Sequence, residues 1–203
     1  IGGRNDEAYL VSSWQYLDVF FGTADRNWGS PDVEGLLLST SPYAFDHLFV
    51  RLGPRRLRLE LLATQLDDLP FHDSESLPVL LLASRYLSLH RVVAMPSERL
   101  SFALSEAALY ANNNGHFRSF EPWYLNPLNL FLLALYGHDV TTSNALLSVE
   151  VSYLLRPALR LYGQLYLDDL QVDTREQADR EPPGYGFTVV ASGGARAGAA
   201  SWS

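Results

Sequence analysis

The chain has 203 residues, with 15 Arg or Lys against 23 Asp or Glu, a formal net charge of -8 and 47% hydrophobic residues. The acidic balance argues against a nucleic-acid partner, which needs a concentrated basic face, and the aromatic content of 12% argues against disorder. Cysteine is absent, which excludes disulfides and thiolate metal sites, and no apolar run approaches the roughly eighteen residues of a membrane-spanning helix.

The first third of the chain contains four segments with strand-like patterns. Aromatic and β-branched residues predict a long first strand at 8–22, followed by a loop at 23–33. Two short strands are predicted next, at 34–39 and 47–52. At 57–66, leucines alternate with charged and polar residues, which predicts a strand with one apolar and one polar face.

The segment 80–93 predicts another strand, with polar residues on both faces. Ser88 and His90 share one face, which we expect to be the polar side. Arg85 and Arg91 fall on the opposite, mainly leucine face. Charged residues on an apolar face are expected only near a membrane interface, where their long side chains can reach water.

The elements that follow are less regular. The segment 99–111 predicts a strand with larger side chains on one face and small Ser or Ala on the other, so its orientation stays open. A short helix is predicted at 127–136 from a preceding Asn, a first-position Pro and a closing Gly, although a buried strand also fits. After a long acidic loop at 168–184, a last strand is predicted at 185–192. In total, the sequence predicts about nine strands and one short helix.

The clearest pattern lies in two consecutive segments, 144–154 and 159–168, that alternate between apolar and polar residues. Because successive side chains of a strand point to opposite faces, they predict an antiparallel hairpin with one apolar and one hydrogen-bonding wall. Each segment has about ten residues, near the length of a tilted strand that crosses a bilayer. The pattern favours a membrane barrel. A soluble β-sandwich or lipocalin-like barrel, with its apolar side in the core, stays open.

Short aromatic and polar blocks stand in a fixed order along the chain. They are Trp14-Gln15-Tyr16, Arg26-Asn27-Trp28-Gly29, Gly35-Leu36-Leu37-Leu38-Ser39 with Phe45-Asp46, Glu106 through Tyr110, Glu121 through Leu128, and Leu161-Tyr162-Gly163-Gln164 with Asp168-Asp169. The most specific part is Tyr124-Leu125-Asn126-Pro127-Leu128. In this order the blocks resemble the Wzi-type capsule assembly proteins, and the resemblance extends over most of the chain.

The resemblance implies an all-β fold, an antiparallel up-and-down transmembrane β-barrel of about eighteen strands, in the outer membrane of a Gram-negative bacterium. Residues 1–203 are then expected to be a single segment of that barrel domain, truncated at both ends. The implied function is non-catalytic assembly or attachment of capsular or other extracellular polysaccharide at the cell surface. The expected partners are this polysaccharide and outer-membrane lipid or lipopolysaccharide. We expect a monomer without cofactor or metal.

Sugars are bound by hydrogen bonds from charged and amide side chains and by stacking on aromatic rings. On this chemistry, the candidate polysaccharide-binding residues are Arg26, Trp28, Glu106, Tyr110, Glu121, Trp123, Tyr124, Asn126, Arg160, Tyr162, Gln164 and Asp168. Structural roles are the alternatives: interior ion pairs can satisfy one another, Asn126 can cap a helix, and Arg26 and Trp28 can brace a loop. Trp14 and Tyr153 are predicted to be interfacial anchors.

Catalysis is not expected. No Gly-x-Ser-x-Gly elbow occurs, and Ser88 and His90, two positions apart on one strand, are poorly placed for proton transfer. Asp67 and Asp68 are interpreted as solvated loop charge, and no phosphate loop or metal-spaced motif is present. A passive diffusion channel is the alternative function, because a polar barrel interior suffices for it. A soluble ligand-binding β-barrel is a further alternative.

Overall fold

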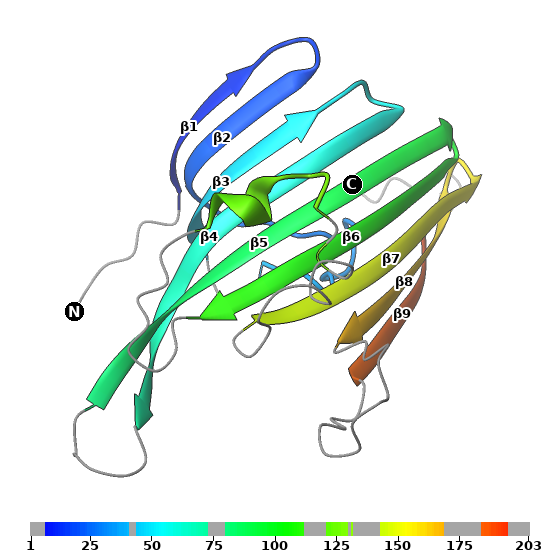
Figure 1. Cartoon of the computed structure of the whole chain (residues 1–203). Coiled ribbons are helices and arrows are strands. Elements are labelled where there is room, and N and C mark those ends of the chain that lie inside the picture. The colour runs from blue at the N-terminus through cyan, green and yellow to red at the C-terminus, as the bar shows by residue number, and fades with distance from the viewer. Residues whose placement is uncertain are drawn as a thin grey trace, which may run out of the picture.

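The computed structural model describes residues 7–40, 44–72, 80–111, 121–129, 131, 143–168 and 184–194. Within these ranges, nine antiparallel strands form one open sheet in which each strand pairs with its neighbours in sequence (Figure 1). The strands are β1 (Ala8–Ser13), β2 (Leu17–Ala24), β3 (Phe45–Leu52), β4 (Leu57–His72), β5 (Leu80–Ser97), β6 (Leu100–Ala111), β7 (Ser143–Arg156), β8 (Leu159–Asp168) and β9 (Gly184–Gly193). The predicted all-β, up-and-down antiparallel class is confirmed.

The structure has nine strands, as predicted, although two of the predicted strands were wrong. The predicted strand at 8–22 is two strands, because a tight turn interrupts it where the Trp14 N–H donates to the Leu17 carbonyl at 2.7 Å. The predicted strand at 34–39 is irregular backbone within the connection from β2 to β3. Instead of forming a strand, this segment buries Leu38 and partly buries Leu37 in a cluster with strand residues, whereas Leu36 is 39% exposed.

Strand register divides the side chains into two faces, because directly paired residues of neighbouring strands point to the same side. The inner face carries Arg51, Glu60, Arg91, Ser148, Glu150 and Gln164. The outer face carries Phe21, Leu48, Leu61, Leu104, Val149 and Leu165.

Most polar residues of the inner face are buried, whereas much of the apolar outer face is exposed. On β7 and β8, Glu150 and Gln164 are only 4% and 3% exposed. Their neighbours on the other side, Val149 and Leu165, are 44% and 42% exposed. The alternating hairpin predicted for the two consecutive segments is therefore confirmed, and the buried wall is the hydrogen-bonding one.

The orientation of β5 is opposite to the prediction. Glu60 of β4 pairs directly with Arg91, which places Arg91 on the inner face and His90 with Ser88 on the outer face. The physical reason is charge pairing, because Arg91 meets the carboxylates of Glu60 and Glu150 on the inner side. On β6 the orientation left open by the sequence is resolved, with the small Ser and Ala residues facing inward.

The helical content of the described residues is small. A 3₁₀ turn, η1 (Pro122–Leu125), precedes Asn126, whose side-chain oxygen accepts the Leu128 N–H at 3.1 Å as an N-cap would. Most of the helix predicted at 127–136 lies outside the described residues. A helix with the length and hydropathy needed to span a bilayer is absent from the part of the chain that the structure describes.

Candidate functional site

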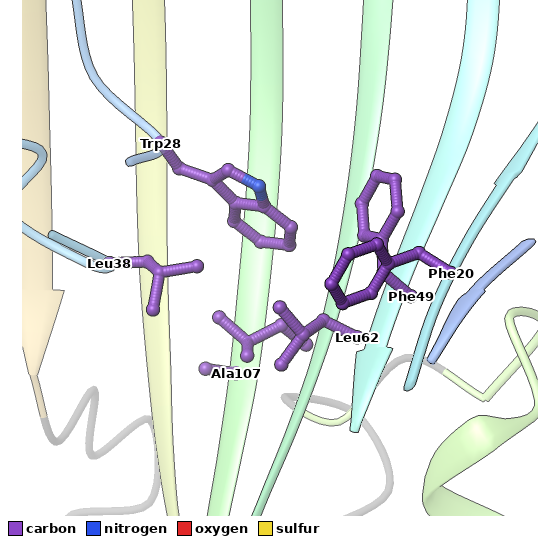
Figure 2. Packing of buried hydrophobic residues seen from close by; sticks show 7 residues of the cluster. Phe20, Trp28, Leu38, Phe49, Leu62 and Ala107 are labelled. Carbon is purple, nitrogen blue, oxygen red and sulfur yellow. The ribbon is translucent and has the colours of Figure 1, made fainter. Parts of the chain in front are cut away.

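The connection from β2 to β3 folds onto the inner face of the sheet. Figure 2 shows Trp28 and Leu38 pointing from this connection toward ring and leucine side chains of the strands. The buried cluster consists of Phe20, Trp28, Leu38, Phe49, Leu62, Leu89 and Ala107. Trp28 is only 3% exposed, so its ring is used for packing inside the molecule. We call the described residues 25–40 the inner plug.

The inner plug is held in shape by backbone contacts and one asparagine. The Trp28 N–H donates to the Leu38 carbonyl at 2.9 Å, and the Asn27 side-chain oxygen accepts the Gly35 N–H at 2.7 Å. A Cβ atom at Gly35 would lie 2.3 Å from the Trp28 carbonyl oxygen, so only glycine permits this close approach. The backbone of the plug therefore has a defined conformation that these contacts fix.

Gln164 of β8 fixes the inner plug to the far side of the sheet. Its side-chain oxygen accepts the Leu36 N–H at 3.0 Å. Its amide nitrogen donates to the Trp28 carbonyl at 3.4 Å and to the Ser148 hydroxyl at 3.0 Å. This predicted sugar ligand thus satisfies polar groups of the plug and of β7.

Arg26 anchors the beginning of the inner plug. Its Nε donates to His47 Nε2 at 2.6 Å, and its guanidinium lies 3.7 Å from the Phe49 ring centroid and 4.8 Å from that of Phe20. Burial lowers the pKa of Arg26 to about 10, so the side chain remains protonated at neutral pH. A cation held over these two neighbouring rings contributes to seating the plug.

An ionic network lies on the inner face toward the short turns of the sheet. Arg91 Nη2 donates to Glu150 Oε2 at 2.8 Å, and the Tyr162 hydroxyl donates to the same oxygen at 3.2 Å. Glu60 lies 3.8 Å from Arg91 and 2.9 Å from Arg58. A cavity of about 130 Å³ lies beside this network.

On the outer face, the described part of the segment 121–131, residues 121–129 and 131, covers a cluster of tyrosines. Tyr110 is fully buried, and its ring stacks on Tyr86 and Tyr124 with centroids 5.3 and 4.2 Å apart. The Glu121 N–H approaches the Tyr110 hydroxyl at 3.4 Å, and Trp123 meets Tyr124 edge to face. Figure 1 shows η1 in front of the sheet, and the inner plug lies behind it.

The same segment covers the polar residues that β5 and β6 place on the outer face. Glu106 accepts the Phe131 N–H at 3.0 Å and lies 3.1 Å from His90 Nδ1. The Phe131 ring lies over the imidazole, with centroids 4.3 Å apart. Buried Ser88 is on the same face. The segment therefore shields a polar patch on an otherwise apolar face.

The twelve candidate residues do not form one site. Arg26, Trp28, Arg160, Tyr162, Gln164 and Asp168 belong to the inner face, where Asp168 also accepts a hydrogen bond from Asn144 at 2.8 Å. Glu106, Tyr110, Glu121, Trp123, Tyr124 and Asn126 belong to the outer cluster and its covering segment. The sheet separates the two sets. Within each set, the described contacts are with other parts of the chain.

A third feature is an open trough of about 690 Å³ that contains none of the twelve candidates. Its lining residues are Phe21, Asp46, His47, Leu48, Ala63, Thr64, Gln65, Leu66, Asp67, Asp68 and Tyr86. They come from β2, β3, β4 and β5, and only the Asp67-Asp68 pair is conspicuous in the sequence. Sequence reasoning missed the trough because no local pattern predicts which strands contribute to it.

Comparisons with protein-family models, curated proteins and solved structures find no match to this chain. Among the residues that the structure describes, no group of three or more His, Asp or Glu side chains is placed to hold a metal ion.

Proposed function

We propose that the chain forms part of the wall of a transmembrane β-barrel in the bacterial outer membrane and attaches extracellular polysaccharide without catalysis. The observation that carries the proposal is the inverted sheet, in which ionic and polar groups are buried on the inner face beside the apolar cluster under the plug, whereas the outer face exposes large apolar side chains. Glu60, Ser148 and Glu150 are at most 5% exposed. In a lipid-facing barrel, the apolar side chains point outward and the interior is polar.

A soluble barrel accounts less well for this arrangement. Its core would be lined by the apolar side of each strand, with charged residues in water. Here large apolar side chains on seven strands are exposed together: Leu10, Leu57, Val92, Phe102, Leu104, Val149, Val151, Leu161, Leu165, Phe187 and Val189. Apolar surface that is continuous over this many strands is typical of contact with lipid or another apolar partner.

The connections between strands also support a membrane barrel. At one end of the sheet the strands are joined by two to four residues, at 14–16, 53–56, 98–99 and 157–158. At the other end the connections span 25–44, 73–79, 112–142 and 169–183. Short turns at one rim and long loops at the other are typical of outer-membrane barrels. Trp14 and Tyr153, predicted interfacial anchors, lie at the short-turn rim and are 59% and 39% exposed.

The inner plug favours attachment over passive diffusion. A channel needs an open polar interior, whereas Trp28 and Leu38 fill the inner face between β2 and β6. Gln164 and Arg26 hold the plug at both sides. An occluded interior is also what the resemblance to Wzi-type proteins implies, and it leaves the outward rim as the surface for polysaccharide.

The proposal is tested by expressing the full-length protein in a Gram-negative host that makes a capsule, with a deletion strain as the control. We expect the protein in the outer-membrane fraction, low conductance in planar bilayers, and release of polysaccharide into the medium when the gene is deleted. High steady conductance with unchanged polysaccharide retention would favour the channel instead. Solubility without detergent would favour the soluble barrel.

A further inference from the structure

The open trough lies where the sheet changes from apolar to polar. On the outer face of β4, Leu57, Leu59 and Leu61 are followed by Ala63 and then by Gln65, which is the first polar residue. From there β4 and β5 extend beyond the described end of β3. In the proposed barrel, this level is the membrane surface on the long-loop side, where polysaccharide is present.

The trough has the size and the wall of a sugar site. Its volume of about 690 Å³ falls in the usual range of roughly 300–1,000 Å³ for ligand pockets. Phe21 lines it with a ring that is 63% exposed, and Tyr86 lines it on β5. An exposed ring beside hydrogen-bonding groups suits the apolar face of a pyranose. The remaining floor is formed by Leu48 and Ala63.

The polar groups of the trough select by charge. Asp46, Asp67 and Asp68 supply carboxylates, and Gln65 adds an amide. None of the described lining residues is Arg, and the nearby Arg85 guanidinium donates to the Asp67 backbone carbonyl at 2.9 Å. Asp46 also accepts a hydrogen bond from the Thr23 hydroxyl. Ionised carboxylates are acceptors only, so they pair with sugar hydroxyls or ammonium groups. They repel carboxylate or phosphate groups on a ligand, because like charges at short range disfavour binding.

We propose that this trough binds polysaccharide through neutral or amino-bearing sugar residues and rejects acidic ones. The inference rests on the proposed function, and it specifies the class of polymer that the protein attaches. Recognition combines stacking of a pyranose on Phe21 with hydrogen bonds from its hydroxyl or ammonium groups to Asp67 and Asp68.

The test uses the full-length protein in detergent, with hexamers of glucose, glucosamine and galacturonic acid as probes in calorimetric titrations at low salt. We expect the first two hexamers to bind and the acidic hexamer to bind at least tenfold more weakly. The double variant Asp67→Asn/Asp68→Asn is expected to weaken the glucosamine hexamer by about tenfold and to remove the discrimination against the acidic one. Phe21→Ala is expected to weaken both productive hexamers by about tenfold.

Asp32→Asn is the matched control, because Asp32 is an exposed carboxylate of the inner plug outside the trough. It is expected to bind all three probes as the parent protein does. Equal or tighter binding of the acidic hexamer, no binding of any hexamer, or trough variants indistinguishable from Asp32→Asn would overturn the inference. If cells with the trough variants retain polysaccharide as cells with the parent protein do, the trough is refuted and the proposed function is not. Absence of the parent protein from the outer-membrane fraction would refute the proposed function.

Discussion

Replacing Val149 by arginine tests whether the outer face meets lipid. Val149 is the seventh of fourteen residues in β7 and pairs with Leu104 and Leu165 on the neighbouring strands. At about 3.3 Å per residue, it lies roughly 20 Å along the strand from either end, farther than an arginine side chain reaches. At the bilayer midplane, arginine in place of an apolar residue lowers the free energy of unfolding by about 2–4 kcal/mol. At a site exposed to water, a substitution changes that free energy by about 0.5 kcal/mol or less.

The assay is urea titration of the full-length protein in phosphatidylcholine vesicles, followed by tryptophan fluorescence and by gel mobility with and without heating. A loss of about 3 kcal/mol lowers the folded-to-unfolded ratio by roughly a hundredfold. Gln65→Arg is the depth control, because Gln65 is exposed on the same face beyond the apolar residues of β4, and its cost is expected to be near zero. Equal small costs for both variants would refute a lipid-facing surface.

Three further predictions concern the inner face and its plug. Glu150→Gln removes the buried carboxylate that pairs with Arg91 and is expected to cost about 3 kcal/mol in the same titration; a change below about 1 kcal/mol would contradict a role in stability. Gly35→Ala places a Cβ atom 2.3 Å from the Trp28 carbonyl oxygen, and it is expected to displace the plug and to raise conductance in planar bilayers. Unchanged conductance would contradict the need for glycine at this position. The Thr40 hydroxyl and N–H donate to Glu34 and hold its pKa below the ordinary value. This contact therefore stabilises the plug above the ordinary pKa and is lost as pH falls through the lowered one. Thr40→Val is expected to raise the pKa of Glu34 in a carboxylate NMR titration, and an unshifted pKa would contradict the contact.

The sequence predicts the fold best where one property alternates along a strand. In β7 and β8, polar and apolar residues occupy opposite faces, so the hairpin and its two walls follow from side-chain periodicity. On β5 both faces carry polar residues, and periodicity alone cannot orient the strand. The register of Glu60 with Arg91 decides the orientation, and this register depends on pairing between strands.

The errors near the N-terminus have a similar cause. The turn between β1 and β2 contains Trp14 and Tyr16 and lacks the Gly, Pro or Asn that usually predicts a turn. Leu38 has the hydrophobicity of a strand residue, yet it belongs to the buried cluster of the plug, whose other members include residues of five strands, β2 to β6. The composition of the trough lay beyond sequence reasoning, because its residues are separated by up to 65 positions, from Phe21 to Tyr86, and meet only once the sheet has formed.

The amide of Gln164 has a consequence for the order of assembly. Its bonds join Leu36 to a residue 128 positions later in the chain, so they can form only after β3 through β8 are in place. The plug therefore docks late. Before β8 has formed, the plug is not fixed to the inner face, and the indole of Trp28 is exposed to water. In a variant that keeps Trp28 and replaces the other three tryptophans by Phe, quenching of its fluorescence by a soluble quencher during refolding is expected to persist until β8 has formed, so that Trp28 reports completion of the sheet.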